Sequence, residues 1–265
     1  RFKSYPRNQN LNMNSLAEKL AGAWLKKDLI DIKSEDLPKN RKESHLIQKQ
    51  FHEALNKKTV GWKIGMVTKS IQEGAKVDGP MIGKIIEETV LINPLKIEYS
   101  KVPHCILECE FALKFLEDTK MVSGAENKKG NYEIYISLEL VSTRIKPDTK
   151  KDLNSRDLMF LNVADNGAAG AIIIGDKIKN LDSIDLNSIQ VEVNVNGKIT
   201  GSWEKRAHPV EAIKCIINEF KDSPVTFKKG DWFMTGSVIQ PMKVSKGDKL
   251  KINFKTLGKI DLEFI

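Results

Sequence analysis

Cysteine is scarce in this chain, and long hydrophobic runs are missing altogether. Among 265 residues there are three cysteines, Cys105, Cys109 and Cys215, and none has a metal-type spacing to another cysteine or to a histidine. A disulfide framework is therefore not expected, and we predict reduced, buried thiols in a cytoplasmic protein. No stretch reaches the roughly 18 apolar residues that a membrane-spanning helix needs, so we expect no membrane partner.

The beginning of the chain also lacks a targeting signal. Residues 1–12 have no apolar centre of the kind found in signal peptides, and the first residue is arginine. We interpret Met13 as the native start and residues 1–12 as an appended, disordered leader.

Positive charge is in excess but is not concentrated. Lysine and arginine number 43 against 35 acidic residues, which gives a formal net charge of +8. The lysines are scattered, often as pairs at predicted loops, and no arginine-rich helix or row of interleaved aromatic residues is present. This pattern favours a solvated surface over a nucleic-acid-binding patch, so we expect no nucleic-acid partner.

Apolar residues at helical spacing predict helices mainly near the N-terminus. Ser15 and Glu18 have the spacing of a capping box, which predicts a first helix over residues 16–30. A second helix is predicted over residues 43–58. Further helices are predicted after a capping Thr68, over residues 155–166, and over residues 208–221, where Val210, Ile213, Ile217 and Phe220 would form the buried stripe.

Alternating hydrophobicity predicts strands in most of the remaining chain. They are expected over residues 59–67, 82–113, 131–145, 168–176, 189–201 (a hairpin turning at Asn196–Gly197) and 247–265. Helices that come first, followed by mostly antiparallel strands with one long helix inserted, predict an α+β fold.

Two carboxylates interrupt the apolar stretch HCILECEFALKF, residues 104–115. In a strand, Leu107 and Cys109 face one side, whereas Glu108 and Glu110 share the other. From residue 106 to residue 112 no further charged side chain joins them on that face. Taken alone, a Glu-x-Glu pattern is more typical of an exposed, solvated strand.

A second uncharged strand, SLELV, carries another lone carboxylate, Glu139. If the three carboxylates were buried together, they would repel one another unless a positive charge lay among them. A hard divalent cation such as Mg²⁺ fits that need, because it prefers oxygen ligands. The sequence by itself does not show that the two strands meet.

The pentapeptide GWKIG places a lysine between two glycines. Trp62 and Ile64 would face the core of a strand, so Lys63 points to the other side. There it could lie in a cleft and bind a substrate carboxylate or move a proton. A surface lysine whose stem covers apolar neighbours fits the pattern equally well.

Six motifs in order resemble the 2-keto-4-pentenoate hydratase and 4-oxalocrotonate decarboxylase group of the fumarylacetoacetate hydrolase-like superfamily. The motifs are GWKIGMVTKSIQEGAKVDGPMIGKI, ECEFAL, LELVSTRI, VADNGAAGAIIIG, HPVEAIKCIINEF, and GDWFMTGS followed by VSKGDKLKINFKTLGKIDLEF. The resemblance covers residues 13–265 and implies an α+β fold with a mixed β-roll or barrel, assembled as homo-oligomers. We therefore expect one catalytic domain, with a mainly helical portion over residues 13–80 and a β-rich, metal-binding portion over residues 81–265.

The resemblance also implies the residues of a site. Its metal ligands correspond to Glu108, Glu110 and Glu139, which would hold Mg²⁺ or Mn²⁺, and its catalytic lysine corresponds to Lys63. The positions expected near the substrate are Lys63, Asp165, Asn166, Gly236 and Ser237.

Some positions depart from the group's pattern. Met81 stands where many hydratases of the group have an acid, and an apolar residue there looks more like the decarboxylases. Thr235, Gly236 and Ser237, by contrast, look more like the hydratases. Ala168 replaces a frequent serine, and Ser142-Thr143-Arg144 stands where Asp-Ser-Arg often follows the third ligand.

The function implied is a divalent-metal-dependent hydratase in meta-cleavage-type aromatic catabolism. It would add water to a 2-hydroxy-2,4-dienoate of the 2-keto-4-pentenoate type and give a 4-hydroxy-2-oxo acid. A 4-oxalocrotonate-type decarboxylase on the same metal site is the alternative. Hydrolysis of a C–C bond would need a histidine–acid pair, and none is evident around His52, His104 or His208. An inactive metal-binding relative is the alternative from another class, supported by Met81 and Ala168.

Overall fold

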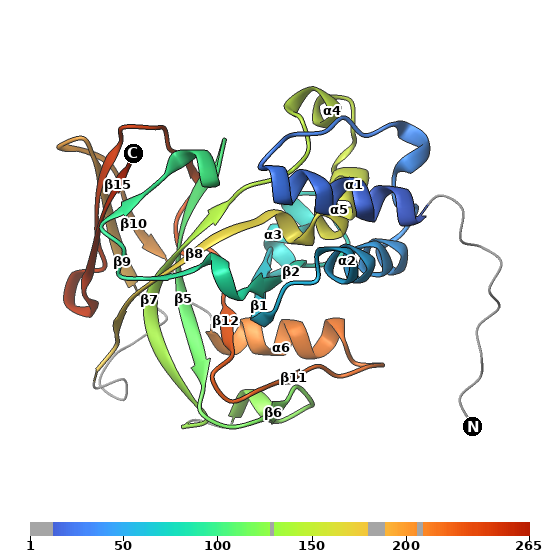
Figure 1. The fold of residues 1–265 in the computed structure, drawn as a ribbon. Coiled ribbons are helices and arrows are strands. Elements are labelled where there is room, and N and C mark those ends of the chain that lie inside the picture. Colours follow the sequence, from blue (N-terminus) through green and yellow to red (C-terminus); the bar gives the residue numbers. More distant parts are fainter. Residues whose placement is uncertain (1–12, 128–129, 180–188, 206–208) are drawn as a thin grey trace.

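The computed structural model describes residues 13–127, 130–179, 189–205 and 209–265 (Figure 1). The leader predicted over residues 1–12 and the histidine at position 208 lie outside these ranges. Among the described residues, no helix combines the length and the apolar character that a bilayer crossing requires.

Six helices are present in the described part of the chain. They are α1 (Met13–Lys26), α2 (Arg41–Leu55), α3 (Lys69–Gly74), α4 (Pro147–Lys151), α5 (Ser155–Ala164) and α6 (Pro209–Glu219). The capping box predicted at Ser15 is wrong, because α1 already includes Met13 and Ser15 therefore lies inside it. The predicted cap of α3 is confirmed, since the Thr68 hydroxyl accepts a hydrogen bond from the Ile71 N–H at 3.4 Å.

Most strands form two mixed sheets. The large sheet has the order β2-β1-β12-β5-β7-β8-β3, with β13 paired to β5; the small sheet has the order β10-β9-β14-β15-β4. The large sheet contains β1 (Thr59–Gly65), β2 (Met81–Ile86), β3 (Val90–Ile92), β5 (Ile106–Phe115), β7 (Tyr132–Val141), β8 (Ala169–Lys177), β12 (Trp232–Met234) and β13 (Met242–Lys243). The small sheet contains β4 (Lys96–Ile97), β9 (Ile189–Val195), β10 (Lys198–Lys205), β14 (Lys249–Asn253) and β15 (Lys259–Phe264), and a separate ribbon pairs β6 (Thr119–Lys120) with β11 (Thr226–Phe227).

The predicted hairpin is confirmed. β9 and β10 pair in antiparallel fashion around Asn196 and Gly197, whose φ angles are 55° and 86°. Two successive residues in the left-handed region are what a tight two-residue hairpin turn demands, and the Asn-Gly pair supplies them at little cost.

Three apolar cores hold these elements together. The main core fills the space between the two sheets, with Phe111 and Leu138 from the large sheet and Val193 and Ile252 from the small one. A second core packs α1, α2 and α5 together, and a third lies on the opposite face of the large sheet around Ile172. Figure 1 shows this order of layers, with most helices on one side of β5, β7 and β8 and the small sheet on the other.

Helix α6 follows the predicted buried stripe in part, since Ile213 is buried and Ile217 and Phe220 are half-buried against the main core. Pro209, Ala212, Ile213 and Ile216 are buried, whereas Val210 is exposed. Both stripes obey the helical period, so the sequence pattern could not choose between them.

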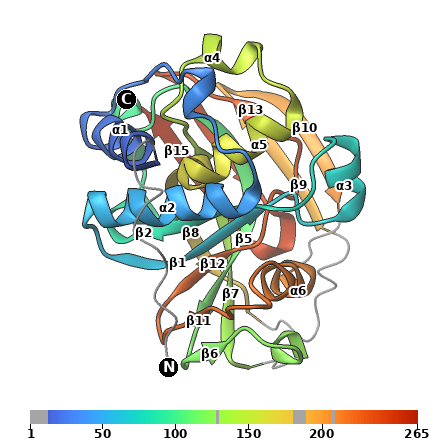
Figure 2. The same cartoon turned by 90° about the vertical axis from the view of Figure 1, so that its right-hand side faces the viewer.

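The strand β1 belongs to the N-terminal portion of the chain and lies inside the large sheet. It is parallel to β12 and antiparallel to β2. Figure 2 shows α2 beside β2, and the Gln48 side chain of α2 donates to the Ile82 carbonyl of β2 at 2.8 Å. The α+β fold is confirmed, while the division of the domain at residue 80 stays a prediction.

The pairing of β1 with β12 can be tested at Gly61. A Cβ there would lie 1.8 Å from the Trp232 carbonyl oxygen, and the φ of +137° is one that other residues rarely adopt. We expect Gly61→Ala to lower the free energy of unfolding by at least about 3 kcal/mol, because backbone must move to admit the methyl group. Urea denaturation measures this change.

Gly22 in α1 supplies the control, because a Cβ there meets nothing within 4 Å. Gly22→Ala should raise the free energy of unfolding by about 0.5–1 kcal/mol through the lower entropy of the unfolded chain. A Gly61→Ala protein as stable as the original would contradict the close pairing.

Candidate metal centre

The register of β5 and β7 brings the three predicted carboxylates together. Glu108 lies directly opposite Glu139, and Glu110 lies opposite Ser137. One oxygen from each of Glu108, Glu110 and Glu139 falls within 4.8 Å of the others. The two strands therefore meet as the cation hypothesis requires. The face continues to Lys114, beyond the stretch considered in the sequence, and that ammonium lies 5.1 Å from the centre of the Trp232 ring.

Burial rules out a solvated strand face for two of the three. Glu110 is 0% exposed and Glu139 is 1% exposed, whereas Glu108 is half-buried. Glu110 Oε2 accepts a hydrogen bond from the Gly236 N–H at 3.0 Å, but Glu110 Oε1 and Glu139 Oε1 have no hydrogen-bond partner. Carboxylate oxygens buried without donors are costly, and a cation bound among them would remove that cost.

Lys63 points into the same region from β1. It pairs with Met234 of β12, which in turn pairs with Ala112 of β5, so all three share the face of the carboxylates. Lys63 is 0% exposed, and its Nζ lies 3.2 Å from Glu139 Oε1. The surface-lysine interpretation is therefore wrong. Ile64, on the opposite side of the strand, is part of the main core as expected.

The contact between Lys63 and Glu139 is an ion pair without hydrogen-bond geometry. Neither the Lys63 Nζ nor the Glu139 Oε1 has a hydrogen-bond partner, although they are only 3.2 Å apart. Three N–H donors and several oxygen lone pairs thus converge on one buried spot with hydrogen-bonding capacity to spare. Such a spot can take up a small oxygen-rich molecule together with a cation.

A left-handed turn, Asn166–Ala168, lies against Lys63. The φ angles of Asn166, Gly167 and Ala168 are 52°, 62° and 55°. A Cβ on Gly167 would come within 2.9 Å of Lys63 Cε, and one on Gly83 within 2.1 Å of the Asn166 carbonyl oxygen. The structure thus brings the turn that starts at Asn166 against the lysine stem, while the place of Asn166 near a substrate stays a prediction.

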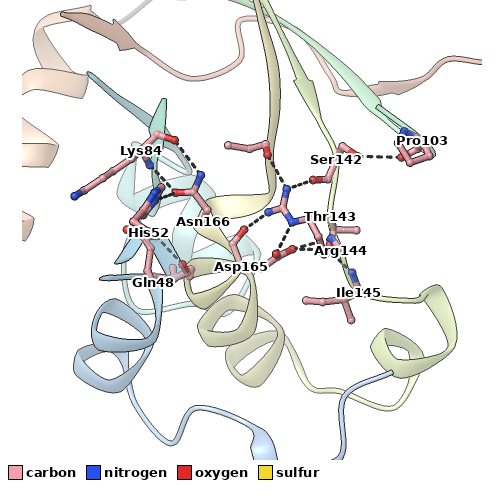
Figure 3. Close-up of polar contacts among 12 residues, drawn as sticks. Gln48, His52, Lys84, Pro103, Ser142, Thr143, Arg144, Ile145, Asp165 and Asn166 are labelled. Carbon is pink, nitrogen blue, oxygen red and sulfur yellow. Dashed lines mark hydrogen bonds and ion pairs between the residues drawn. The ribbon is translucent and has the colours of Figure 1, made fainter. Parts of the chain in front are cut away.

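Asp165 has a different environment from its neighbour. It is fully buried, and its Oδ1 accepts from Arg144 Nε at 2.6 Å, while its Oδ2 accepts from Thr143 Oγ1 at 2.9 Å and from the Arg144 N–H at 3.0 Å (Figure 3). Arg144 Nη2 also donates to the Asp165 carbonyl. Both carboxylate oxygens are engaged inside the chain, so Asp165 anchors the beginning of the turn.

The two remaining predicted residues follow β12. Gly236, with φ of 91°, turns its N–H toward Glu110 and so holds one of the carboxylates. The Ser237 hydroxyl is half-buried and donates to the Ile239 carbonyl at 2.9 Å. Of this pair, Gly236 is the one that contacts the carboxylate cluster directly.

Two side chains near the site were missed in the sequence. Ser137 is fully buried opposite Glu110, and its hydroxyl has no partner. Its place two residues before Glu139 on the same strand face is the signal that could have identified it. His52 of α2 lies with Nε2 2.8 Å from Asn166 Oδ1, and its spacing of four residues from Gln48 is the corresponding helical signal.

A histidine–acid pair does exist at His45, a histidine that the sequence analysis did not consider. His45 Nε2 lies 2.7 Å from Glu219 Oε1, and Arg41 Nε donates to the same oxygen. The two partners are 174 residues apart, so no local pattern could reveal them. Among the described residues this pair makes no contact with the three carboxylates or with Lys63, and it links α2 to the end of α6 instead.

Burial dominates the electrostatics of the cluster. It raises the pKa of Glu139 from 4.5 to about 7, against the lowering effect of the Lys63 charge and with a further increase from Glu108. Burial and the neighbouring Glu139 and Glu108 also raise the pKa of Glu110 well above its usual range, opposed by Lys63 and by the Gly236 N–H. Near neutral pH, protons and a metal ion would therefore compete for these oxygens.

Two of the three cysteines match the expectation of buried thiols. All are free, with Cys105 and Cys109 buried and Cys215 half-buried. Burial raises the pKa of the Cys109 thiol, which belongs to the main core on the side away from the carboxylates. Cys109 thus separates two glutamates in the sequence without sharing their face.

Comparisons with known proteins show that the chain is similar in sequence to hydratases and to decarboxylases. No family model matches it. A 2-hydroxyhexa-2,4-dienoate hydratase from Comamonas testosteroni is 25% identical over 222 residues, covering 81% of each chain. A 4-oxalocrotonate decarboxylase from Pseudomonas putida is 22% identical over 268 residues, covering 97% of this chain and 100% of the relative. The resemblance recognised in the motifs is therefore confirmed.

A solved structure shows the same fold. The 4-oxalocrotonate decarboxylase from Pseudomonas putida G7, complexed with magnesium and adipate, superimposes with a TM-score of 0.82 at 20% identity and covers 100% of both chains. The likeness confirms the predicted α+β architecture.

The raised pKa of Glu139 predicts how metal binding depends on pH. The pKa of Glu139 is about 7 in the folded chain, compared with the ordinary value of 4.5. In the pH window between these two values, the folded chain keeps a proton on Glu139 that the unfolded chain has lost. The free energy of unfolding without metal should therefore fall as pH rises through the window. Mg²⁺ replaces the proton, so it should raise the melting temperature more at about pH 8 than at about pH 6. Thermal unfolding with and without Mg²⁺ at both pH values measures this, and an equal or larger shift at the lower pH would contradict it.

Proposed function

We propose that this chain, like the hydratases and decarboxylases it resembles, is a divalent-metal-dependent lyase acting on 2-hydroxy-2,4-dienoates. The observation that carries the proposal is a cluster of three carboxylates on one sheet face, with Lys63 buried 3.2 Å from Glu139. Of the two lyase activities, we propose the hydratase first. It would add water to a substrate of the 2-keto-4-pentenoate type and give a 4-hydroxy-2-oxo acid in meta-cleavage-type aromatic catabolism.

Glu108, Glu110 and Glu139 would hold Mg²⁺ or Mn²⁺. Their all-oxygen donor set suits a hard cation, and the two buried oxygens without hydrogen-bond partners support this assignment. A cation bound there supplies Lewis-acid stabilisation of the negative charge that develops on the oxygens of a 2-oxo acid. Gly236 supports the site by fixing Glu110 through its N–H.

Lys63 would do the proton chemistry. Its ammonium has three donors and no hydrogen-bond partner, so it can orient a substrate oxygen or transfer a proton to the dienol carbon chain. Its stem is confined by Gly167, which limits the positions that the amino group can reach. Asn166 and Ser237 would lie beside the substrate. Asp165 would not touch the substrate but would anchor the turn through its hydrogen bond with Arg144.

The decarboxylase is a second candidate because of Met81. Met81 pairs with Gly65 at the end of β1, and a Cβ on Gly65 would lie 3.6 Å from the Met81 methyl carbon. By the resemblance, an apolar side chain stands where many hydratases of the group have an acid, and decarboxylation does not need water to be activated. The presence of Lys63 together with all three carboxylates argues against an inactive relative.

We also propose that the protein is cytoplasmic and forms homo-oligomers. Three free cysteines support a reducing compartment. Assembly is inferred from the resemblance to the group.

Two substrates separate the candidates. The protein is incubated with Mg²⁺ and either 2-hydroxypenta-2,4-dienoate or 4-oxalocrotonate. Loss of the dienol absorbance without carbon dioxide identifies the hydratase, and release of carbon dioxide identifies the decarboxylase. Metal binding without turnover of either dienoate would overturn the lyase proposal.

Glu110→Gln tests the metal centre. It should weaken Mg²⁺ binding by more than about tenfold, since changes outside the ligand shell alone cost 10–100-fold, and it should reduce turnover accordingly. The fold should persist, because a neutral amide is less costly to bury than a carboxylate. Isothermal titration calorimetry measures the affinity.

Glu133→Gln is the matched control. Glu133 lies on β7, as Glu139 does, but is paired with Lys177 and has a side chain 25% exposed. Its substitution should leave Mg²⁺ affinity unchanged. Equal affinities in the Glu110→Gln protein and the original would refute the assigned ligand set.

A further inference from the structure

The buried His52 has a defined hydrogen-bond role toward Asn166. Its Nε2 lies 2.8 Å from Asn166 Oδ1 (Figure 3). The same oxygen accepts from the Lys84 N–H at 2.7 Å, and Asn166 Nδ2 donates to the Lys84 carbonyl at 2.9 Å. A backbone N–H can only donate, so the atom facing it is the amide oxygen, and His52 must donate from Nε2.

The ring of His52 is neutral and serves one partner. Burial lowers its pKa to about 4, with nearby Lys84 and Arg144 acting in the same direction and the hydrogen bond to Asn166 opposing them. In the neutral ring the proton sits on Nε2, and the buried Nδ1 has no partner. Within the described part of the chain, the single hydrogen bond of this ring is the one to the Asn166 amide.

The turn that begins at Asn166 needs support from its surroundings. Three successive residues adopt positive φ, and a left-handed conformation is unfavourable for a residue with a Cβ such as Ala168. The turn is held at its start by Asp165 and at its end by the Ser142 N–H, which donates to the Ala168 carbonyl at 2.9 Å. The third support of the turn is the Asn166 side-chain amide, which forms hydrogen bonds with Lys84 of β2 and with His52.

The position of this turn determines the position of Lys63. Gly167 lies so close that an added Cβ would be 2.9 Å from Lys63 Cε and 2.9 Å from the Ile82 carbonyl oxygen. The turn therefore limits the lysine stem on one side. On its other side the ammonium meets Glu139. A displacement of Asn166 and Gly167 would free the stem and move the amino group.

We propose that His52 is a positioning residue that fixes the Lys63 amino group by way of Asn166 and the left-handed turn. The proposal rests on the proposed function in so far as Lys63 carries the proton chemistry. Docking of α2 does not by itself require His52, because Gln48 already donates to the Ile82 and Val163 carbonyls at 2.8 and 2.6 Å. His52 adds a separate link from α2 to the turn.

Two substitutions at His52 separate the hydrogen bond from the shape of the ring. His52→Phe keeps a ring and removes the donor, whereas His52→Gln places an amide N–H close to the position of Nε2. His45→Phe is the control, since it removes a histidine about two turns earlier on the same helix that binds Glu219 instead.

Steady-state kinetics at saturating Mg²⁺ gives the first readout. We expect His52→Phe to lower kcat at least about tenfold, because small misplacements of a catalytic group are expensive, while KM and the Kd for Mg²⁺ stay within about threefold. His52→Gln should recover most of the lost kcat, and His45→Phe should retain it.

The NMR signal of Lys63 gives a readout that needs no turnover. With ¹³C-labelled lysine, the Cε resonance assigned by its loss in Lys63→Arg should shift or broaden in His52→Phe and stay unchanged in His52→Gln. If neither dienoate is consumed but this pattern holds, the positioning role stands and the substrate class fails.

An unaltered Lys63 resonance in folded His52→Phe, or equal changes in the Phe and Gln variants, would overturn the proposal. Should His52→Phe fail to fold, His52→Asn takes its place, because its shorter amide reaches only the position of Nδ1. An unaltered Lys63 resonance in His52→Asn, or equal changes in the Asn and Gln variants, would then overturn the proposal.

Discussion

Lys63 and Glu139 face each other 3.2 Å apart where neither is reached by solvent, and the large sheet is organised around this buried ion pair. A buried charge that loses its partner is strongly destabilising, so the fold must keep the two side chains together. Strand β12 does much of this work. It lies between β1, which carries the lysine, and β5, which carries two carboxylates, and the turn after it supplies the N–H that binds Glu110.

The helices contribute to this site without facing the carboxylates. Their own apolar core fixes α2, and α2 then reaches the strands and the left-handed turn through Gln48 and His52. Two polar networks, one on Asn166 and one on Asp165, hold adjacent residues of the same turn from different sides (Figure 3). Buried hydrogen-bond networks of this kind favour one arrangement of the turn, which is what a site with buried charges at its centre requires.

What could be predicted from the sequence was local. The alternation around Glu108, Glu110 and Glu139 placed each carboxylate on a strand face, and the Asn-Gly turn located a hairpin, because both signals come from a few consecutive residues. Register is not local: nothing in either strand states that Glu108 pairs with Glu139. Arg144 with Asp165, His52 with Asn166 and His45 with Glu219 are likewise contacts between distant segments. The helical period fixed the existence of α6 but did not show that Val210 would be exposed and Pro209, Ala212 and Ile216 buried.

The pairing of β1 with β12 also has a consequence in time. Gly61 and Trp232 are partners, so the ribosome must add about 170 residues after β1 before its second neighbour exists. At the usual 5–20 residues per second this takes about 10–35 s. During that interval β2 can cover one edge of β1, while the other edge remains an open template for pairing. The synthesis of β12 thus determines when the second edge of the lysine strand is covered, and a chain that stopped before β12 would leave that edge exposed.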